Sequence, residues 1–134
     1  MAFMDIDLVD QVKEKHELWD IEKTIRFSSL SYRLKELETR LGRSGYGIDC
    51  GLRCLYLQFH YDLSDRELES RLRFDIAFRW FCGFSAFEQT PDHSYFGRFR
   101  ELLGTKRIGK LFALIVKRAR NMGIMRHMFR FADS

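Results

Sequence analysis

Two helix-start signals in the middle of the sequence constrain the fold more than any other feature. The first is Ser64 followed by Glu67, the spacing of a capping box, in which each side chain bonds the other residue's backbone N–H. The second is the stretch Thr90-Pro91-Asp92, in which either Thr90 or Asp92 is suited to cap a helix. Because caps fix where helices begin, these signals predict two short helices joined by a connection, the second ending at Gly104.

Apolar residues at helical spacing predict further helices. We expect a loosely held helix within residues 1–20, and others over Leu30 to Leu41, Ile48 to Tyr61 and Lys106 to Met122. With one Pro and few runs of Val, Ile or Thr, the sequence does not favour a sheet. It predicts an all-α fold, a small multi-helix domain in which the two capped helices form a helix-turn-helix-like pair.

The connection between the capped helices is dense in aromatic residues: Phe74, Phe78, Trp80, Phe81 and Phe84. We interpret it mainly as a plug for the hydrophobic core. Stacking of exposed rings on nucleobases is the alternative, but such rings usually alternate with basic residues on a strand surface. Here only Arg79 interrupts the aromatic run.

A Gly-rich break at residues 42–47 suggests how the chain is divided. It matches neither phosphate-loop pattern, so we interpret it as a hinge or surface loop. We expect an N-terminal helical region with this hinge over residues 1–47, a helical domain over 48–123 and a separate tail over 124–134.

Positive charge is concentrated in the C-terminal third. The formal net charge is +4, and residues 98–134 carry ten Lys or Arg against two acids, whereas residues 1–47 carry eight basic and nine acidic side chains. Such a field favours an anionic partner.

The two C-terminal helices present different polar faces. In the helix before Gly104, the residues Ser94, Gly97, Arg98 and Glu101 face away from the apolar arc, giving the small, polar and basic surface that a groove-entering helix needs. Gly97 inside a helix would be explained by close approach of another backbone.

In the last helix Lys106, Lys110, Lys117 and Arg120 fall within an arc of about 80°. This stripe is consistent with phosphate contacts and equally with an ordinary solvated face.

No catalytic or metal-binding pattern is visible. Cys50, Cys54 and Cys82 lack a CxxC spacing, so we expect reduced thiols packed in the core of a cytoplasmic protein rather than a zinc site. The four histidines, His16, His60, His93 and His127, are scattered, and His93 beside Ser94 is a weak signal. No apolar run approaches the length of a membrane span. We therefore expect no intrinsic enzyme activity and no metal bound by this chain.

Three blocks of sequence carry a family resemblance. Leu63-Ser64-Asp65-Arg66-Glu67-Leu68-Glu69, then Ala77-Phe78-Arg79-Trp80-Phe81, then Pro91-Asp92-His93-Ser94 stand in the order and spacing of the N-terminal domain of InsH-like insertion-sequence transposases. The likeness covers about residues 52–131. Tyr95 and Gly97 depart from it, since relatives often carry smaller or hydroxylated side chains there.

The resemblance implies a helical domain that binds the element's terminal inverted repeats. In such bacterial enzymes a ribonuclease-H-like domain follows, with an Asp-Asp-Glu triad that binds two divalent ions such as Mg²⁺. The tail at residues 128–134 resembles the first strand of that domain, with Asp133 in the place of the first aspartate. We therefore expect a transposase fragment that lacks its catalytic domain.

On this interpretation the partner is double-stranded DNA and the location is cytoplasmic, at the nucleoid. Ser94 and Arg98 are expected to face bases or backbone. The expected phosphate contacts are Arg100, Lys106, Arg107, Lys110, Lys117 and Arg120. A homo-oligomer, or a heteromer with full-length transposase, is compatible with this role. The alternatives are a helical dimerisation or interaction module and a remnant of a transposase gene without function.

Overall fold

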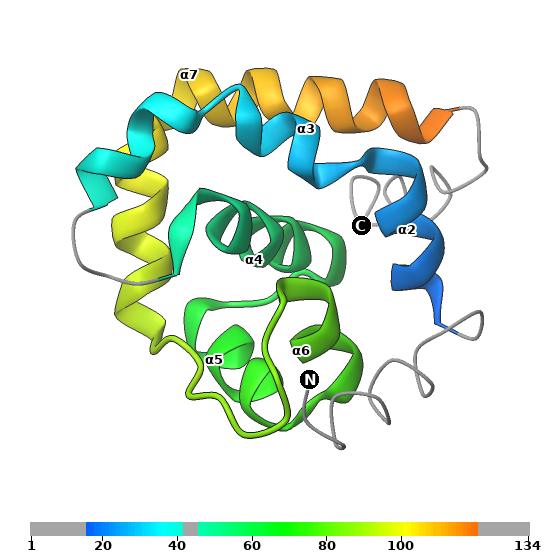
Figure 1. Cartoon of the computed structure of the whole chain (residues 1–134), viewed down its shortest axis with the longest axis vertical. Helices are drawn as coiled ribbons and strands as arrows, with labels where there is room; N and C mark the ends of the chain where they lie inside the picture. The colour runs from blue at the N-terminus through cyan, green and yellow to red at the C-terminus, as the bar shows by residue number, and fades with distance from the viewer. Residues whose placement is uncertain (1–15, 42–45, 121–134) are drawn as a thin grey trace.

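The computed structural model describes residues 16–41 and 46–120, which form helices and the loops between them and contain no strand. α4 (Gly47–Tyr61) lies at the centre, and the other helices surround it (Figure 1). Every residue from Cys50 to Leu57 is buried, because neighbouring helices cover α4 on all sides. The predicted all-α fold is confirmed.

The N-terminal segments lie beside α4 and α7. α2 (Glu17–Ile25) buries Leu18, Ile21 and Ile25 and is capped by His16, whose Nδ1 accepts a hydrogen bond from the Leu18 N–H. α3 (Phe27–Tyr32) follows directly, and Arg26 turns the chain between the two helices at φ 56°. This region and residues 48–119 contribute to one hydrophobic core.

The helix expected over Leu30 to Leu41 is instead divided. α3 ends at Tyr32, and a 3₁₀ helix, η1, follows over Lys35–Leu41. Leu34 and Leu37 are both buried, and a spacing of three residues suits a 3₁₀ turn, in which residues i and i+3 eclipse. Glu38 then accepts a hydrogen bond from the Ile48 backbone N–H and ties η1 to the start of α4.

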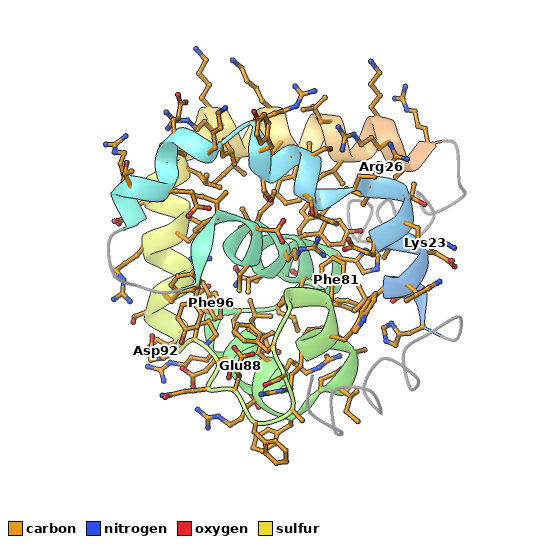
Figure 2. The ribbon with its side chains drawn as sticks, viewed as in Figure 1. Lys23, Arg26, Phe81, Glu88, Asp92 and Phe96 are labelled. Carbon is orange, nitrogen blue, oxygen red and sulfur yellow. The ribbon has the colours of Figure 1, made fainter. Side chains whose placement is uncertain are left out.

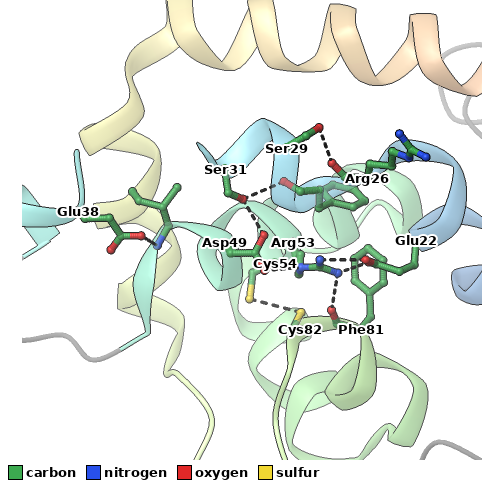
Figure 3. A network of polar contacts seen from close by, with 12 residues as sticks. Glu22, Arg26, Ser29, Ser31, Glu38, Asp49, Arg53, Cys54, Phe81 and Cys82 are labelled. Carbon is green, nitrogen blue, oxygen red and sulfur yellow. Dashed lines mark hydrogen bonds and ion pairs between the residues drawn. The ribbon is translucent and has the colours of Figure 1, made fainter. Parts of the chain in front are cut away.

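A buried arginine joins three helices (Figure 3). Arg53 of α4 forms a two-pronged ion pair with Glu22 of α2 and donates to Asp49 one turn earlier. It also donates to the carbonyl of Phe81 at 3.1 Å. With both acids at its guanidinium, the cation is satisfied inside the core, as a buried charge requires.

α5 (Asp65–Phe74) and α6 (Ile76–Cys82) form the lower layer in Figure 1. The capping box of Ser64 and Glu67 is confirmed, with bonds of 3.1 and 3.0 Å. The core-plug interpretation holds for three of the aromatic residues, since Phe78, Phe81 and Phe84 are buried. Phe74 is 76% exposed.

α7 (His93–Ala119) is bent at Gly104, which has φ 79° and ψ 155°. This backbone region is open essentially to glycine alone. We call residues 93–103 the first arm and residues 105–119 the second arm. The two arms run in different directions, along the side of α4 and across the top of the molecule in Figure 1. The predicted helix end at Gly104 is thereby confirmed.

Candidate nucleic-acid interface

α5 and the first arm of α7, the two helices with predicted caps, pack against each other, but they are not joined by a simple turn, because α6 stands between them in the sequence. Asp92 caps α7 by accepting from the Ser94 and Tyr95 N–H groups, which settles the choice between Thr90 and Asp92. Hydrogen bonds led by that from the Ser94 side chain lower the pKa of Asp92. Glu69 of α5 accepts from the His93 backbone N–H and lies 3.0 Å from its Nδ1. The first turn of α7 is therefore fixed against α5.

The inner face of the first arm is apolar and its outer face is free. Tyr95, Phe96, Phe99 and Leu103 are buried, as the periodicity predicts. Ser94 and Arg98 are exposed on the other side, with Arg98 Nη1 3.3 Å from Ser94 Oγ. These two predicted contact residues thus lie together on one accessible face.

Gly97 is not explained by a close backbone approach. A Cβ there would meet only the Nη2 of Arg100, at 3.8 Å. The helical glycine that does require its small size is Gly51 of α4, where a Cβ would lie 2.3 Å from the Phe99 ring. The close approach is therefore between α4 and the first arm, on the buried side.

Arg100 occupies a different environment from the other predicted cations. It is half-buried and donates to both carboxylate oxygens of Asp65 and to the side-chain oxygen of Gln58. The hydrogen bonds from Arg100 are the main cause of the lowered pKa of Asp65. Arg100 therefore joins the first arm to α4 and α5, and its expected phosphate contact stays a prediction.

The second arm presents the predicted basic stripe. Lys106, Lys110, Lys117 and Arg120 are all exposed, and among the described residues none forms an ion pair. Arg107 is also exposed, and its guanidinium donates to the Leu103 carbonyl at 3.0 Å. The bend at Gly104 separates this stripe from Ser94 and Arg98.

Two arginines that sequence reasoning did not single out shape the same surface. Arg118 donates to the Ile25 carbonyl at 2.6 Å and to Ser29 Oγ at 2.7 Å, which fixes the end of α7 against the α2–α3 turn. Arg26, at that turn, is exposed beside the end of α7 (Figure 2). Its position was not predictable, because it depends on a contact between distant parts of the chain.

A polar pocket of about 460 Å³ opens beside the start of α7. Its walls come from the end of α5, the loop at 83–92 and the first arm. An apolar groove of about 660 Å³ lies on another side, where Phe59 of α4 and Phe112 of α7 approach with ring centroids 4.6 Å apart.

The cysteines and histidines have structural surroundings. Cys54 and Cys82 lie with their sulfurs 3.7 Å apart in the core, and Cys50 is also buried. His60 is buried, and its Nδ1 lies 3.0 Å from the Tyr56 hydroxyl. Among the described residues no three His, Cys, Asp or Glu are placed to hold a metal ion. His127 and Asp133 lie outside the described residues.

Comparison with known proteins gives one match. Residues 6–102 match the family described as a transposase domain (DUF772). No curated protein and no solved structure matches the chain. Within the described residues, no helix combines the length and apolar character needed to cross a membrane.

Proposed function

The chain belongs to the transposase-domain (DUF772) family, and from this premise we propose that it is the DNA-binding part of an insertion-sequence transposase. In this proposal it recognises the terminal inverted repeats of the element as double-stranded DNA. The catalytic steps of transposition are not assigned to it. The location that follows is the bacterial cytoplasm, at the nucleoid.

One observation carries the proposal most directly: the outer face of the first arm is free while its other sides are fixed. The buried side packs on α4 through Phe99, and Arg100 and His93 hold the arm to α5. A recognition helix needs this combination, because its side chains must reach base edges from a rigid support. Arg98 and Ser94 occupy that face.

The second arm supplies the electrostatic component. Four exposed cations without an acidic partner in the described structure, Lys106, Lys110, Lys117 and Arg120, suit phosphate contacts that carry affinity but no sequence information. Because the bend directs the two arms differently, the duplex would be contacted on either side of Gly104. We include Arg107 in the phosphate-contacting set and give Arg100 a positioning role.

The test is binding of the purified chain to duplexes that carry the repeats flanking its gene, against scrambled duplexes, across a salt series. We expect tighter binding to the repeats and a steep salt slope. Arg98→Ala should weaken repeat binding about tenfold, in the range for loss of one base contact. Lys23→Ala is the control, since it removes a charge on the opposite side of the molecule from the start of α7 (Figure 2). An unchanged footprint of Arg98→Ala on the repeat would contradict the assignment of Arg98 as a DNA contact.

The divalent ions used by full-length relatives find no fitting site in the described part. No group of three suitable ligands is present there, so we derive no cleavage step through a metal. A DNA-binding chain of this kind would also be able to repress an intact transposase by occupying its sites.

The apolar groove favours a second candidate function, a helical interaction module that forms homo-oligomers or joins full-length transposase. Leu111, Ile115 and Ala119 already pack inside the chain, so most of the apolar face of the second arm is not available to a partner. The residues that remain available to a partner are Phe59, which is 42% exposed, and the half-buried Phe112. A mass that rises with concentration, with little salt sensitivity of DNA binding, would support this candidate.

A further inference from the structure

The pocket beside the start of α7, which we call the loop pocket, has the lining of a ligand site. Its volume of about 460 Å³ falls within the usual range for small-molecule sites. Tyr46 and Tyr95 supply aromatic surface, with ring centroids 5.1 Å apart, and Arg73 and Arg98 also line it. Arg98 thus belongs both to this pocket and to the proposed DNA-contacting face.

The floor of the pocket is held in shape by Arg79. This buried arginine donates to the carbonyls of Leu72 and Arg73 at the end of α5, and to those of Ser85 and Glu88 in the loop. The loop is thereby fastened to α5, so the pocket is formed before any ligand arrives. All these hydrogen bonds go to backbone, which leaves ligand recognition to other residues.

The free polar groups of the pocket suit a neutral ligand better than a phosphate. Glu88 and Asp92 line it beside the arginines and lie at the same end of the molecule (Figure 2). Their carboxylates offset the charges of Arg73 and Arg98, while Arg79 is engaged with carbonyls. Within the described structure the Gln89 amide and the Thr90 hydroxyl form no hydrogen bond. A planar ring with donors and acceptors on its edge matches this mixture of aromatic and polar groups.

We propose that the loop pocket binds a single nucleobase turned out of the DNA duplex. The inference rests on the proposed function, because the duplex must lie along Ser94 and Arg98 for a base to reach the pocket. In the pocket the base would lie against Tyr46, and its edge would bond Gln89 and Thr90. Bases bound in this way are read by stacking and by hydrogen bonds to their pairing edge.

Two exposed aromatic residues that neighbour pocket-lining residues in the sequence fit the same role. Phe74 and Phe87 are 76% and 80% exposed, and they directly follow Arg73 and precede Glu88 along the chain. A phenyl ring inserted between base pairs compensates for the stacking that an extruded base gives up. We assign this wedge role to Phe87, which lies in the loop itself.

The experiment measures affinity for three duplexes of the repeat sequence: fully paired, with one mismatched pair, and with an abasic site in place of one base. The altered position is moved along the repeat. A mismatch removes part of the cost of extrusion, so we expect affinity about tenfold higher at one position. The abasic duplex is equally deformable but has no base to bind, and should gain much less.

The double variant Gln89→Ala/Thr90→Ala, which removes the two proposed contacts to the base edge, is compared with the parent chain on the same duplexes. It should lose the mismatch gain but keep the parent's affinity for the abasic duplex, which has no base to contact Gln89 or Thr90, and Phe87→Ala should reduce the mismatch gain. The proposal for the pocket would be overturned if mismatched and abasic duplexes gained equally in affinity, or if the mismatch gain survived in the double variant. Either result would leave the proposed binding to the repeats intact. Failure to prefer the repeat over a scrambled duplex would overturn the proposed function and the pocket together.

Discussion

The guanidinium of Arg100 and the carboxylate of Asp65 face each other through two parallel hydrogen bonds, each 2.8 Å long. This pair joins the first arm of α7 to the first turn of α5. Both side chains are partly exposed, so the pair adds modest stability. Its structural effect is to fix how the candidate recognition helix crosses its partner.

Removal of the Asp65 charge should make stability less dependent on acid pH. Arg100 lowers the pKa of Asp65 below its ordinary value of 3.8. The contribution of the ionised Asp65 carboxylate to the free energy of unfolding is therefore complete above about pH 3.8. It is lost as the pH falls through the lower pKa of the folded state. We expect Asp65→Asn to reduce the free energy of unfolding by about 1 kcal/mol at neutral pH.

Urea unfolding between pH 2 and 7 checks this prediction. The difference between parent and Asp65→Asn should shrink below about pH 3.8. Asp62→Asn is the control, because it removes the same charge at an exposed helix end whose φ of 53° asparagine also tolerates. A difference that stays constant with pH would show that the hydrogen bonds, and not the charge, carry the effect.

Two helical glycines should respond to alanine in opposite directions. Gly51→Ala would place a Cβ 2.3 Å from the Phe99 ring, and overpacking of this kind costs about 1–3 kcal/mol. Gly97→Ala meets only the Arg100 side chain at 3.8 Å, so the helix propensity of alanine should stabilise by up to about 1 kcal/mol. Thermal or urea unfolding of both variants measures the contrast. Destabilisation by Gly97→Ala would reveal a constraint on the outer face of the first arm.

Gly104→Ala tests the bend in α7. Nothing lies within 4 Å of a Cβ at Gly104, so the cost is purely one of backbone conformation and should be about 1–3 kcal/mol. Gly109→Ala, in the same helix with equally open surroundings and ordinary helical geometry, should be neutral or stabilising. The free energy of unfolding and the affinity for the repeat should both fall in Gly104→Ala, because a straightened helix moves the second arm relative to the first. Equal behaviour of the two variants would show that the bend is not needed.

Helix ends were predictable from sequence because capping is local. The Ser64–Glu67 box, the cap at Asp92 and the break at Gly104 each depend on residues a few positions apart or on one backbone angle. The aromatic plug was mostly predictable too. Phe74 is exposed because it follows the last buried turn of α5, a detail that depends on how α5 and α6 meet.

Partners across the fold were not predictable. Arg100 has the same charge as Arg98 two residues earlier, and only the crossing of α4, α5 and α7 directs it to Asp65 and Gln58. The loop pocket depends on carbonyls gathered around Arg79, and backbone oxygens leave no trace in a sequence. The surface residues of the site could be predicted from helical periodicity, whereas the contacts that hold them in place could not.

Arg79 should therefore be the most sensitive position near the site. Arg79→Leu keeps much of the side-chain volume but removes the guanidinium donor of four carbonyls, of which, within the described residues, only that of Ser85 keeps a further donor, the Glu88 N–H. We expect a loss of about 2–4 kcal/mol in the free energy of unfolding. Arg71→Leu is the control, because its exposed ion pair with Asp75 should cost at most about 1 kcal/mol. Limited proteolysis should cut Arg79→Leu first within the loop at 83–92, where the carbonyl contacts have been lost. If both variants were equally stable and the loop stayed protected, its shape would be set by Pro91 and the Asp92 cap instead of by the arginine.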